Sequence, residues 1–260
     1  MTDLSVPNKT AHRAHAARHK IRVVTATSLF DGHDAAINVM RRLMQASGAE
    51  VIHLGHNRAV DDIVTAALDE DVQGIAVSSY QGGHLEFFKY MLDLLRARGG
   101  AHIKVFGGGG GVIIPAEAAE LHAYGVTRIY TPEDGAKLGL QGMIDHMLAA
   151  CDFDPAAVEP FDLDAVARGD RRALARLITG LENSTLDETL RSQLAQRAGA
   201  CKTVPVLGIT GTGGSGKSSL TDELVRRLRL DQHDRLKIAL VAVDPSRRKS
   251  GGALLGDRIR

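Results

Sequence analysis

The sequence predicts an α/β protein in which a parallel sheet is followed by helices and a second α/β region. Three observations predict this. Short apolar runs alternate with segments of helical apolar spacing, and the alternation repeats five times within about 130 residues. Glycine-rich or small polar loops follow several of the apolar runs. A Gly-x-x-x-x-Gly-Lys-Ser motif at 211–218 lies between an apolar run and a helical segment.

The elements of the sheet follow from these patterns. Apolar runs of strand length lie at 21–26, 50–54, 74–78, 103–106 and 127–130. Amphipathic segments typical of helices lie at 34–46, 61–69, 84–98, 116–124 and 136–150. Because helical crossovers of this length join parallel neighbours, we expect a flavodoxin-like five-stranded parallel sheet. Ligands of such sheets bind at the carboxyl ends of the strands.

Composition excludes several classes of function. The chain has 260 residues, 44% of them apolar, and a net charge of +1, so no global charge indicates nucleic acid or a membrane surface as a partner. No apolar run approaches the roughly 20 residues of a membrane span, and the first 20 residues lack the apolar core of a secretory signal. Cys151 and Cys201 show no metal-binding spacing, so a reducing cytoplasmic location is expected.

Four regions are predicted along the chain. Residues 1–19, rich in Ala, His and basic side chains, are expected to be a disordered tail, with metal binding as the weaker alternative. The sheet domain covers 20–151. Residues 152–202 are dense in charge, with leucines at helical spacing, and predict a helical connector. Residues 203–260 contain the start of the second α/β region.

The first candidate site lies on the loop between the first strand and the first helix. A His two residues after an Asp can present one ring nitrogen outward while the carboxylate holds the other, which makes the imidazole a better metal ligand. Asp31 and His33 have this spacing. The alternative is that Asp31 caps the helix and His33 is a solvated loop residue.

Two further loops share the same edge of the predicted sheet. Ser78 and Tyr80 follow the third strand, and five consecutive glycines, Gly107–Gly111, follow the fourth. Such a run suits a flat, bulky group lying against the main chain. A flexible surface turn is the alternative for this run.

The second motif predicts a phosphate-binding loop between a strand at 206–210 and a helix at about 217–230. The glycines let backbone N–H groups curl round a phosphate at the helix N-terminus. Lys217 is expected on the β- and γ-phosphates and the Ser218 hydroxyl on Mg²⁺. An apolar strand at 238–244 ends in Asp244, a second candidate for Mg²⁺.

The first three loops together resemble the cobalamin-binding domain of methylmalonyl-CoA mutase-like enzymes. The family writes these signatures Asp-x-His-x-x-Gly, Ser-x-Leu and Gly-Gly, and this chain has Ala36 and Tyr80 in place of the family's Gly and Leu. The resemblance implies adenosylcobalamin bound base-off, with His33 on cobalt and Asp31 behind it. It also implies a cofactor loop and a tail pocket formed by Gly32, Asp34, Ser78, Tyr80, Gly110 and Gly111.

The region from Gly211 onward resembles the G-protein chaperones of cobalamin-dependent mutases. The resemblance implies GTP and Mg²⁺, and Thr212 stands where related partition ATPases carry a Lys. The implied nucleotide contacts are Gly213, Gly214, Ser215, Gly216, Lys217, Ser218, Ser219 and Arg260, with Mg²⁺ on Ser218, Asp244 and Asp257. The basic run at 247–249 departs from the family, and no guanine-reading Asn-Lys-x-Asp is present.

The order of the regions is similar to the N-terminal part of the fused isobutyryl-CoA mutase family. That resemblance implies a homodimeric parent in which a further barrel domain binds acyl-CoA, a radical 1,2 carbon shift between isobutyryl-CoA and n-butyryl-CoA, and GTP hydrolysis that gates cofactor loading, with an adenosyltransferase as a delivery partner. Without a barrel, and with two strands and one helix of the nucleotide fold, residues 1–260 are not expected to catalyse the reaction alone. The segment after about residue 201 is expected to be poorly ordered.

Two alternatives stay open at this stage. One is a stand-alone cobalamin carrier or sensor with a nucleotide-responsive arm and no catalysis. The other is a flavodoxin-like domain for a different flat cofactor, such as a flavin, which explains the glycines but gives no reason for the Asp31–His33 spacing.

Overall fold

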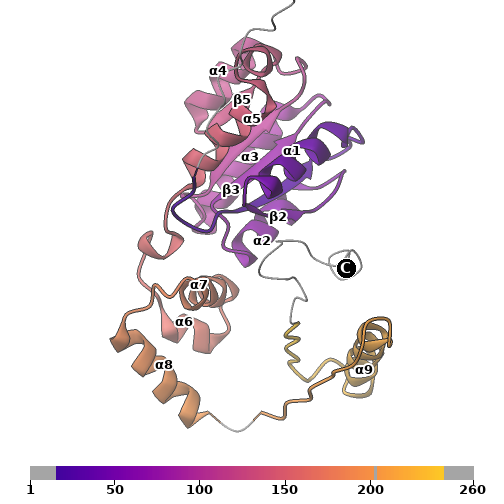
Figure 1. Ribbon diagram of the computed structural model, residues 1–260, viewed down its shortest axis with the longest axis vertical. Helices are drawn as coiled ribbons and strands as arrows, with labels where there is room; N and C mark the ends of the chain where they lie inside the picture. Colours follow the sequence, from indigo (N-terminus) through magenta and orange to yellow (C-terminus); the bar gives the residue numbers. More distant parts are fainter. Residues whose placement is uncertain (1–15, 202–203, 243–260) are drawn as a thin grey trace, which may run out of the picture. The chain divides into compact units, whose positions relative to one another are not determined.

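The computed structural model describes residues 16–201 and 204–242. These fall into two compact units, divided between Gly199 and Ala200. The first unit contains a sheet, the helices on its two faces and a short helical region (Figure 1). In the second, the described residues include the glycine-rich motif and the helix that follows it.

The sheet has five parallel strands in the order β2-β1-β3-β4-β5, which confirms the flavodoxin-like prediction. Thr27 pairs with Ser78, and Ser78 with Gly108, so the central strands β1, β3 and β4 end at the same level. The loops predicted to share one edge therefore do so. The strands are β1 (Arg22–Thr27), β2 (Glu50–His53), β3 (Gly74–Ser78), β4 (Lys104–Gly108) and β5 (Arg128–Tyr130).

Two apolar cores lie on opposite faces of the sheet. Successive strand side chains point to opposite faces, so Val24 enters one core and Val23 the other. Helices α2 (Val60–Asp69), α3 (His84–Ala97) and α4 (Pro115–Tyr124) cover the larger core, and α1 (Ala35–Ala46) and α5 (Pro132–Cys151) cover the smaller (Figure 1). Coverage of both faces explains why β3 is buried throughout.

Helix α5 begins four residues earlier than the predicted start at residue 136. The Thr131 hydroxyl caps it by accepting a hydrogen bond from the Asp134 N–H, and the Asp134 carboxylate accepts one from the Thr131 N–H. Pro132 occupies the first helical position. The sequence Thr-Pro-x-Asp carried this signal. The helix is kinked at Gly139, whose φ of 66° is not helical.

The predicted helical character of residues 152–202 is confirmed. The segment forms a 3₁₀ turn at Pro155–Ala157, then α6 (Leu163–Arg168), α7 (Arg171–Glu182) and α8 (Glu188–Ala200). Helix α7 packs against α2, where Arg171 pairs with Asp69.

The predicted disordered tail is wrong at its end. The backbone N–H groups of Arg18 and His19 donate to the Asp152 carboxylate at 3.0–3.1 Å, and the His19 ring lies 2.9 Å from it. The contacts of the domain therefore begin before the predicted boundary at residue 20, because both oxygens of the Asp152 carboxylate bind the chain there. Residues 1–15 lie outside the described residues.

In the second unit, helix α9 (Lys217–Asp231) is where the sequence predicts it. The strand predicted at 206–210 is wrong, and the described part of 238–244, residues 238–242, is not a strand either. A strand needs a hydrogen-bonded neighbour, and the described residues of this unit offer none. Val206 and Val241 are 92% and 90% exposed, consistent with a segment that buries no core. Asp244, Asp257 and Arg260 lie outside the described residues.

Within the described parts of the chain, no helix combines the length and the apolarity that crossing a bilayer requires.

A substitution at Gly107 can test the packing of β4 against the larger core. A Cβ at this position would lie 2.6 Å from the Phe88 ring and 2.6 Å from Ile129 Cδ1, so Gly107→Ala overpacks the core. We expect it to lower the free energy of unfolding by about 1–3 kcal/mol in urea denaturation. Gly82→Ala is the control, because a Cβ there meets nothing within 4 Å. Equal loss in both variants would contradict the packing.

The two cysteines test the boundary between core and surface. Burial raises the pKa of the Cys151 thiol to about 12, and Cys201 is exposed. A thiol reagent at pH 8 is therefore expected to label one thiol per folded chain, because the thiolate is the reactive form, and two in denaturant. Cys201→Ser should abolish the labelling of the folded chain. Rapid labelling of that variant would contradict the burial of Cys151.

Candidate functional site

The site is built around the carboxylate of Asp31, whose side chain is completely buried. Oδ1 accepts hydrogen bonds from the His33 backbone N–H at 2.9 Å and from His33 Nδ1 at 2.8 Å. Oδ2 accepts one from the Tyr80 backbone N–H at 2.5 Å. The predicted bond between Asp31 and His33 is therefore present. The capping alternative is wrong, because the N-cap of α1 is Asp34 and its side chain makes no capping bond.

The charge of Asp31 follows from these contacts. Burial alone would raise the pKa of the carboxyl, but the N–H of Tyr80 and the two N–H groups of His33 hold the pKa below its ordinary value. The group is thus an anion at neutral pH, and it fixes the proton of the neutral imidazole on Nδ1. The His33 side chain is 68% exposed, and among the hydrogen bonds of the described residues its ring takes part through Nδ1, not through Nε2. This is the arrangement of a metal-binding histidine supported by a carboxylate.

The loop that carries Asp31 is held to its neighbours along its length. Ser28 donates its N–H to the Ser78 carbonyl at 3.0 Å and its hydroxyl to the Ser79 hydroxyl at 3.0 Å. Phe30 has a φ of 64°, a strained value for a bulky residue, and its N–H donates to Asn57 Oδ1 at 2.8 Å. These bonds to β3 and to the loop before α2 fix the geometry on which His33 depends.

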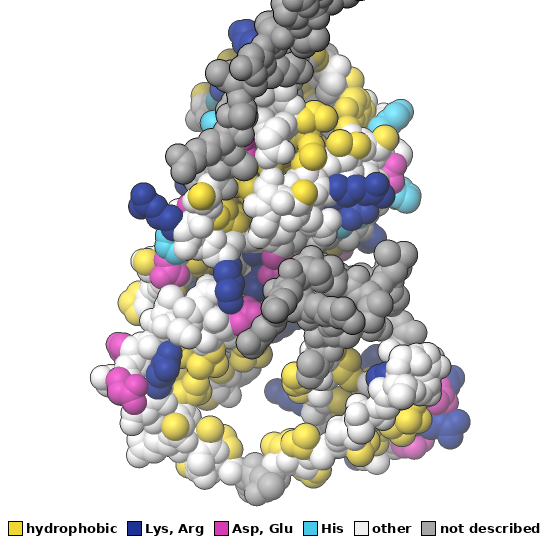
Figure 2. All heavy atoms as spheres, in the orientation of Figure 1, with side chains coloured by type: hydrophobic (Ala, Val, Ile, Leu, Met, Phe, Trp, Pro, Cys, Tyr) yellow, Lys and Arg dark blue, Asp and Glu magenta, His cyan; other side chains and the backbone are white. Residues whose placement is uncertain are grey.

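A cavity of about 550 Å³ opens between α1 and α5, over β3 and β4. Apolar side chains gather at the surface between these helices (Figure 2). Of the predicted tail-pocket residues, Ser78, Tyr80 and Gly110 line the cavity, and Gly111 does not. The remaining lining is mostly apolar and comes from α1, from β4 and from α5, with Met40, Phe106, Leu140, Met143 and Met147 as examples.

The five-glycine run serves packing as well as this cavity. Gly107 and Gly108 belong to β4. A Cβ on Gly109 would lie 2.1 Å from the Ser79 carbonyl oxygen, and the Ser79 N–H donates to the Gly108 carbonyl at 2.8 Å. The alternative of a free surface turn is therefore wrong for these three glycines, because the loops after β3 and β4 touch through their backbones.

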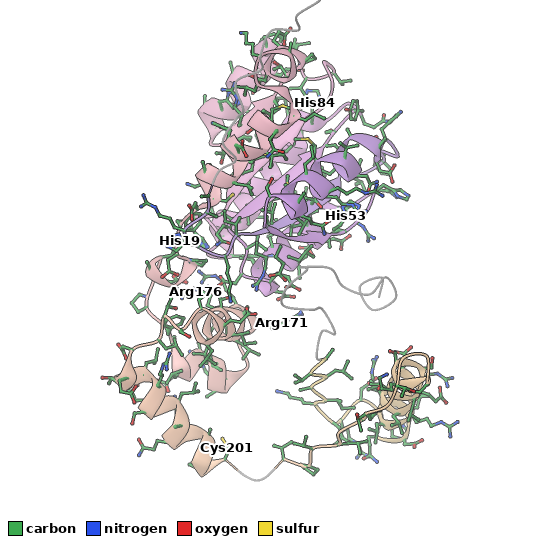
Figure 3. All side chains as sticks on the ribbon, in the orientation of Figure 1. His19, His53, His84, Arg171, Arg176 and Cys201 are labelled. Carbon is green, nitrogen blue, oxygen red and sulfur yellow. The ribbon has the colours of Figure 1, made fainter. Side chains whose placement is uncertain are left out.

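Sequence reasoning missed a partly buried pair that joins the helices after these two loops. His84, at the start of α3, places Nε2 2.9 Å from Glu117 of α4, and Glu117 also accepts the Ile114 N–H at 3.0 Å. His53 lies elsewhere in the domain, on the edge strand β2 (Figure 3). The partners are 33 residues apart, so no local pattern reveals the pair. In the described part of the chain, no three His, Cys, Asp or Glu side chains converge as a metal centre.

The glycine-rich loop of the second unit forms a turn ahead of α9. Gly216 has a φ of 81° and serves as the N-cap of the helix. Lys217 Nζ and the Ser215 hydroxyl each donate to the Thr212 carbonyl at 2.8 Å. Gly213, Gly214, Ser218 and Ser219 are exposed in the same segment, so the predicted nucleotide residues within the described range lie together.

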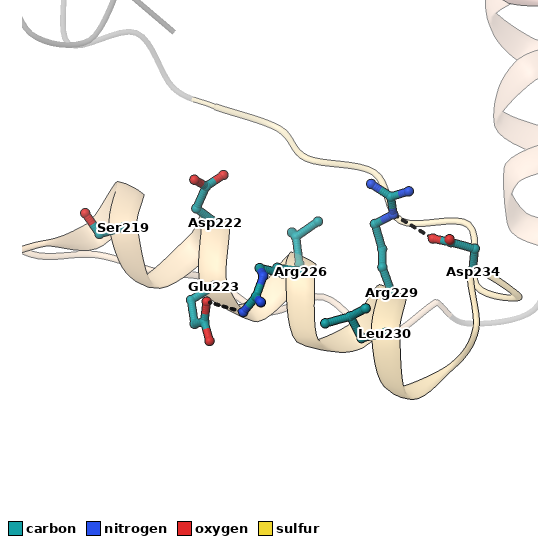
Figure 4. A pocket seen from close by; sticks show the side chains of 8 residues that line it. Ser219, Asp222, Glu223, Arg226, Arg229, Leu230 and Asp234 are labelled. Carbon is teal, nitrogen blue, oxygen red and sulfur yellow. Dashed lines mark hydrogen bonds and ion pairs between the residues drawn. The ribbon is translucent and has the colours of Figure 1, made fainter.

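A charged groove lies along the flank of α9 (Figure 4). Its side chains pair with one another: Arg226 lies 3.4 Å from Glu223, and Arg229 lies 2.6 Å from Asp234. Of the loop residues named above, only Ser219 reaches this groove. The groove is therefore mainly a set of helix-surface ion pairs, and it shares Ser219 alone with the predicted nucleotide residues of the described range.

Comparison with known families now separates the two regions. Residues 21–137 match the B12 binding domain family, which covers the sheet and all three loops at its edge. Residues 174–260 match the family described as methylmalonyl-CoA mutase-associated GTPase MeaB. This second match begins within α7, inside the segment predicted as a connector. Fold and loops thus define a B12-binding type of α/β domain, and the second match joins it to a region of the mutase-associated GTPase family.

Whole-chain relatives carry the same order of regions. The chain is 65% identical to a fused isobutyryl-CoA mutase of Cupriavidus metallidurans over all of its length and 24% of the relative's. It is 62% identical to one from Geobacillus kaustophilus, with 94% of the chain and 23% of the relative covered. A pivalyl-CoA mutase small subunit of Xanthobacter autotrophicus is 34% identical over 45% of the chain and 78% of that subunit. The chain belongs to the fused isobutyryl-CoA mutase family, and it spans about a quarter of the length of these fused relatives.

The role of the Asp31 carboxylate can be tested without any ligand. Asp31→Asn replaces one of two buried acceptor oxygens by an NH₂ group, so one N–H of His33 or Tyr80 loses its acceptor. We expect the free energy of unfolding in urea to fall by about 1–3 kcal/mol. Asp34→Asn, at a cap without a side-chain bond, should change it by less than about 0.5 kcal/mol. Matching stabilities in the two variants would argue against the hydrogen bonds described.

Proposed function

We propose that this chain binds adenosylcobalamin in the base-off form, with His33 Nε2 as the lower ligand of cobalt. One observation carries the proposal: a fully buried carboxylate holds Nδ1 of an imidazole whose side chain is 68% exposed. The donor set fits this cofactor. His33 offers one nitrogen, so a metal bound there must bring its other ligands with it, as cobalt does in a corrin ring.

The cavity between α1 and α5 supports the second half of the proposal. A displaced benzimidazole nucleotide tail needs a deep, mostly apolar slot next to the metal ligand, and this slot of about 550 Å³ opens on the same edge of the sheet. Ser78, Tyr80 and Gly110 are proposed to line the tail. Gly32 and Asp34, on either side of His33, are proposed to face the cofactor from the loop.

For the second region we propose GTP as the nucleotide and Mg²⁺ as its metal. The match to a GTPase family and the turn ahead of α9 support this. Gly213–Ser219 would receive the phosphates, with Lys217 as their cation and Ser218 on Mg²⁺. Asp244, Asp257 and Arg260 stay predicted contacts of this site outside the described residues.

For the longer protein we propose the activity that the names of the fused relatives state, that of an isobutyryl-CoA mutase. The sequence resemblance implies n-butyryl-CoA as the other isomer. Adenosylcobalamin, when bound, supplies the radical for the 1,2 carbon shift by homolysis of its cobalt–carbon bond. The residues of this chain hold the cofactor: Asp31 keeps the proton on Nδ1, and His33 keeps Nε2 free for cobalt. GTP hydrolysis gating cofactor loading, delivery by an adenosyltransferase, a homodimeric parent and a cytoplasmic location complete the proposal.

Absorbance titration tests the cobalamin site. Adenosylcobalamin added to the 260-residue chain should show the base-off shift together with histidine ligation. His33→Ala should lose the histidine ligation and weaken binding at least about tenfold, because it removes the imidazole that Asp31 supports at this edge of the sheet. His56→Ala is the matched control, since His56 is exposed two residues before Arg58 on a neighbouring loop.

A ¹⁵N-histidine label adds a second readout. In the reduced cob(II)alamin complex, coupling of the unpaired electron to a histidine nitrogen should be present in the wild-type chain and absent in His33→Ala. Equal spectra for the two proteins, or coupling lost in His56→Ala, would reject His33 as the ligand.

A further inference from the structure

The carboxylate of Asp31 bonds to both His33 and Tyr80, whose rings contact each other. It accepts the Nδ1–H of the His33 ring through one oxygen and the backbone N–H of Tyr80 through the other. The two residues are therefore bonded to the two oxygens of one buried carboxylate. Their ring centroids lie 5.7 Å apart with an interplanar angle of 47°, within the range of a favourable tilted aromatic contact.

The Tyr80 ring also packs closely against Gly110. A Cβ on Gly110 would lie 2.5 Å from Tyr80 Cε1. Gly110 also has a φ of +56°, so two independent constraints keep a glycine there. The Tyr80 ring thus packs closely against Gly110 as well as against the His33 imidazole, and Gly110 limits the positions that the ring can take.

Tyr80 belongs to two parts of the candidate site, the apolar cavity and the surroundings of His33. It lines the cavity between α1 and α5, whereas His33 is not among the residues lining that cavity. Among the hydrogen bonds of the described residues, Tyr80 takes part through its backbone N–H alone, so its hydroxyl anchors nothing there. The position of the ring is therefore set by packing, and the imidazole is the group on which that packing acts.

His33 needs such a contact. With 68% of its side chain exposed, the imidazole is held by a single ring hydrogen bond, and that bond permits rotation about its own axis. A ring packed against one face removes this freedom before a metal arrives. Preorganisation of a ligand lowers the ordering that binding requires and so raises affinity.

We propose that Tyr80 is a positioning residue for His33: its ring, and not its hydroxyl, holds the imidazole in the orientation that ligates cobalt. This rests on the proposed role of His33. It differs from a tail-pocket role, because it acts on the metal–imidazole bond even when no nucleotide tail is present.

The test uses diaquocobinamide, a corrin that carries cobalt but lacks the nucleotide tail. Binding of cobinamide to the 260-residue chain, followed by the spectral change of imidazole ligation, reports His33 alone. Tyr80→Phe keeps the ring and should bind like wild type. Tyr80→Leu, which keeps an apolar side chain but removes the ring, should bind cobinamide about twofold to tenfold more weakly, the fold-change of one aromatic contact.

A second readout needs no cofactor. In the unliganded protein, the His33 ring protons should be shifted by the ring current of Tyr80 in the wild type and in Tyr80→Phe, and should return toward the values of an exposed histidine in Tyr80→Leu. Thermal unfolding of each variant confirms that it is folded. This readout holds whether or not cobalt binds.

The outcomes separate the two proposals. If Tyr80→Leu binds cobinamide as the wild type does, or weakens only cobalamin, Tyr80 acts on the tail and the positioning role is overturned. If Tyr80→Phe is as defective as Tyr80→Leu, the hydroxyl is responsible and the proposal is equally overturned. If His33→Ala binds cobinamide with wild-type spectrum and affinity, the proposed cobalt ligation itself fails, while the ring-proton shifts still report the contact.

Discussion

A buried carboxylate that accepts three N–H groups is the interaction on which the site depends. An isolated anion cannot be taken from water without a large penalty, so Asp31 is tolerated only because two loops supply hydrogen bonds to it. The strand order makes this supply available. β1 and β3 are adjacent in the middle of the sheet, and the chain leaves them toward helices on opposite faces. The gap at such a switch point is where an open α/β sheet binds its ligand.

The glycines after β4 follow from the same closeness. Once the loop after β3 is bent toward Asp31, the Ser79 carbonyl lies so near β4 that only a residue without Cβ fits at Gly109. Gly107 faces Phe88 and Ile129 in the larger core for an unrelated reason. A run of glycines that sequence alone assigns to one cofactor is therefore explained by three demands: core packing, loop contact, and the wall of the cavity.

Local chemistry was predictable from the sequence, and long-range chemistry was not. The Asp31–His33 bond joins residues two apart, so spacing reveals it. The sheet order was predictable because five alternating periods leave few topologies. The Tyr80 N–H on Asp31 and the His84–Glu117 pair join residues 49 and 33 apart, and no periodicity encodes them. The strand predicted at 206–210 failed for the complementary reason: apolar pattern favours a strand, but a strand forms only with a neighbour.

Helix α7 contacts the sheet at the amino-terminal ends of the strands, opposite the carboxyl ends that carry the site. Arg22, the first residue of β1, bonds to Glu182 of α7 at 3.1 Å and to the Glu70 carbonyl at 2.7 Å, and Gln73, just before β3, bonds to the Lys20 carbonyl at 2.7 Å. These contacts involve the amino-terminal ends of the strands whose carboxyl ends carry Asp31 and Tyr80. Because β1 and β3 are central and buried, they form a stiff connection between the two edges. Helix α7, which precedes the nucleotide-binding motif in the sequence, is thus bound at the amino-terminal ends of these strands. It does not occupy the carboxyl ends, where His33 lies.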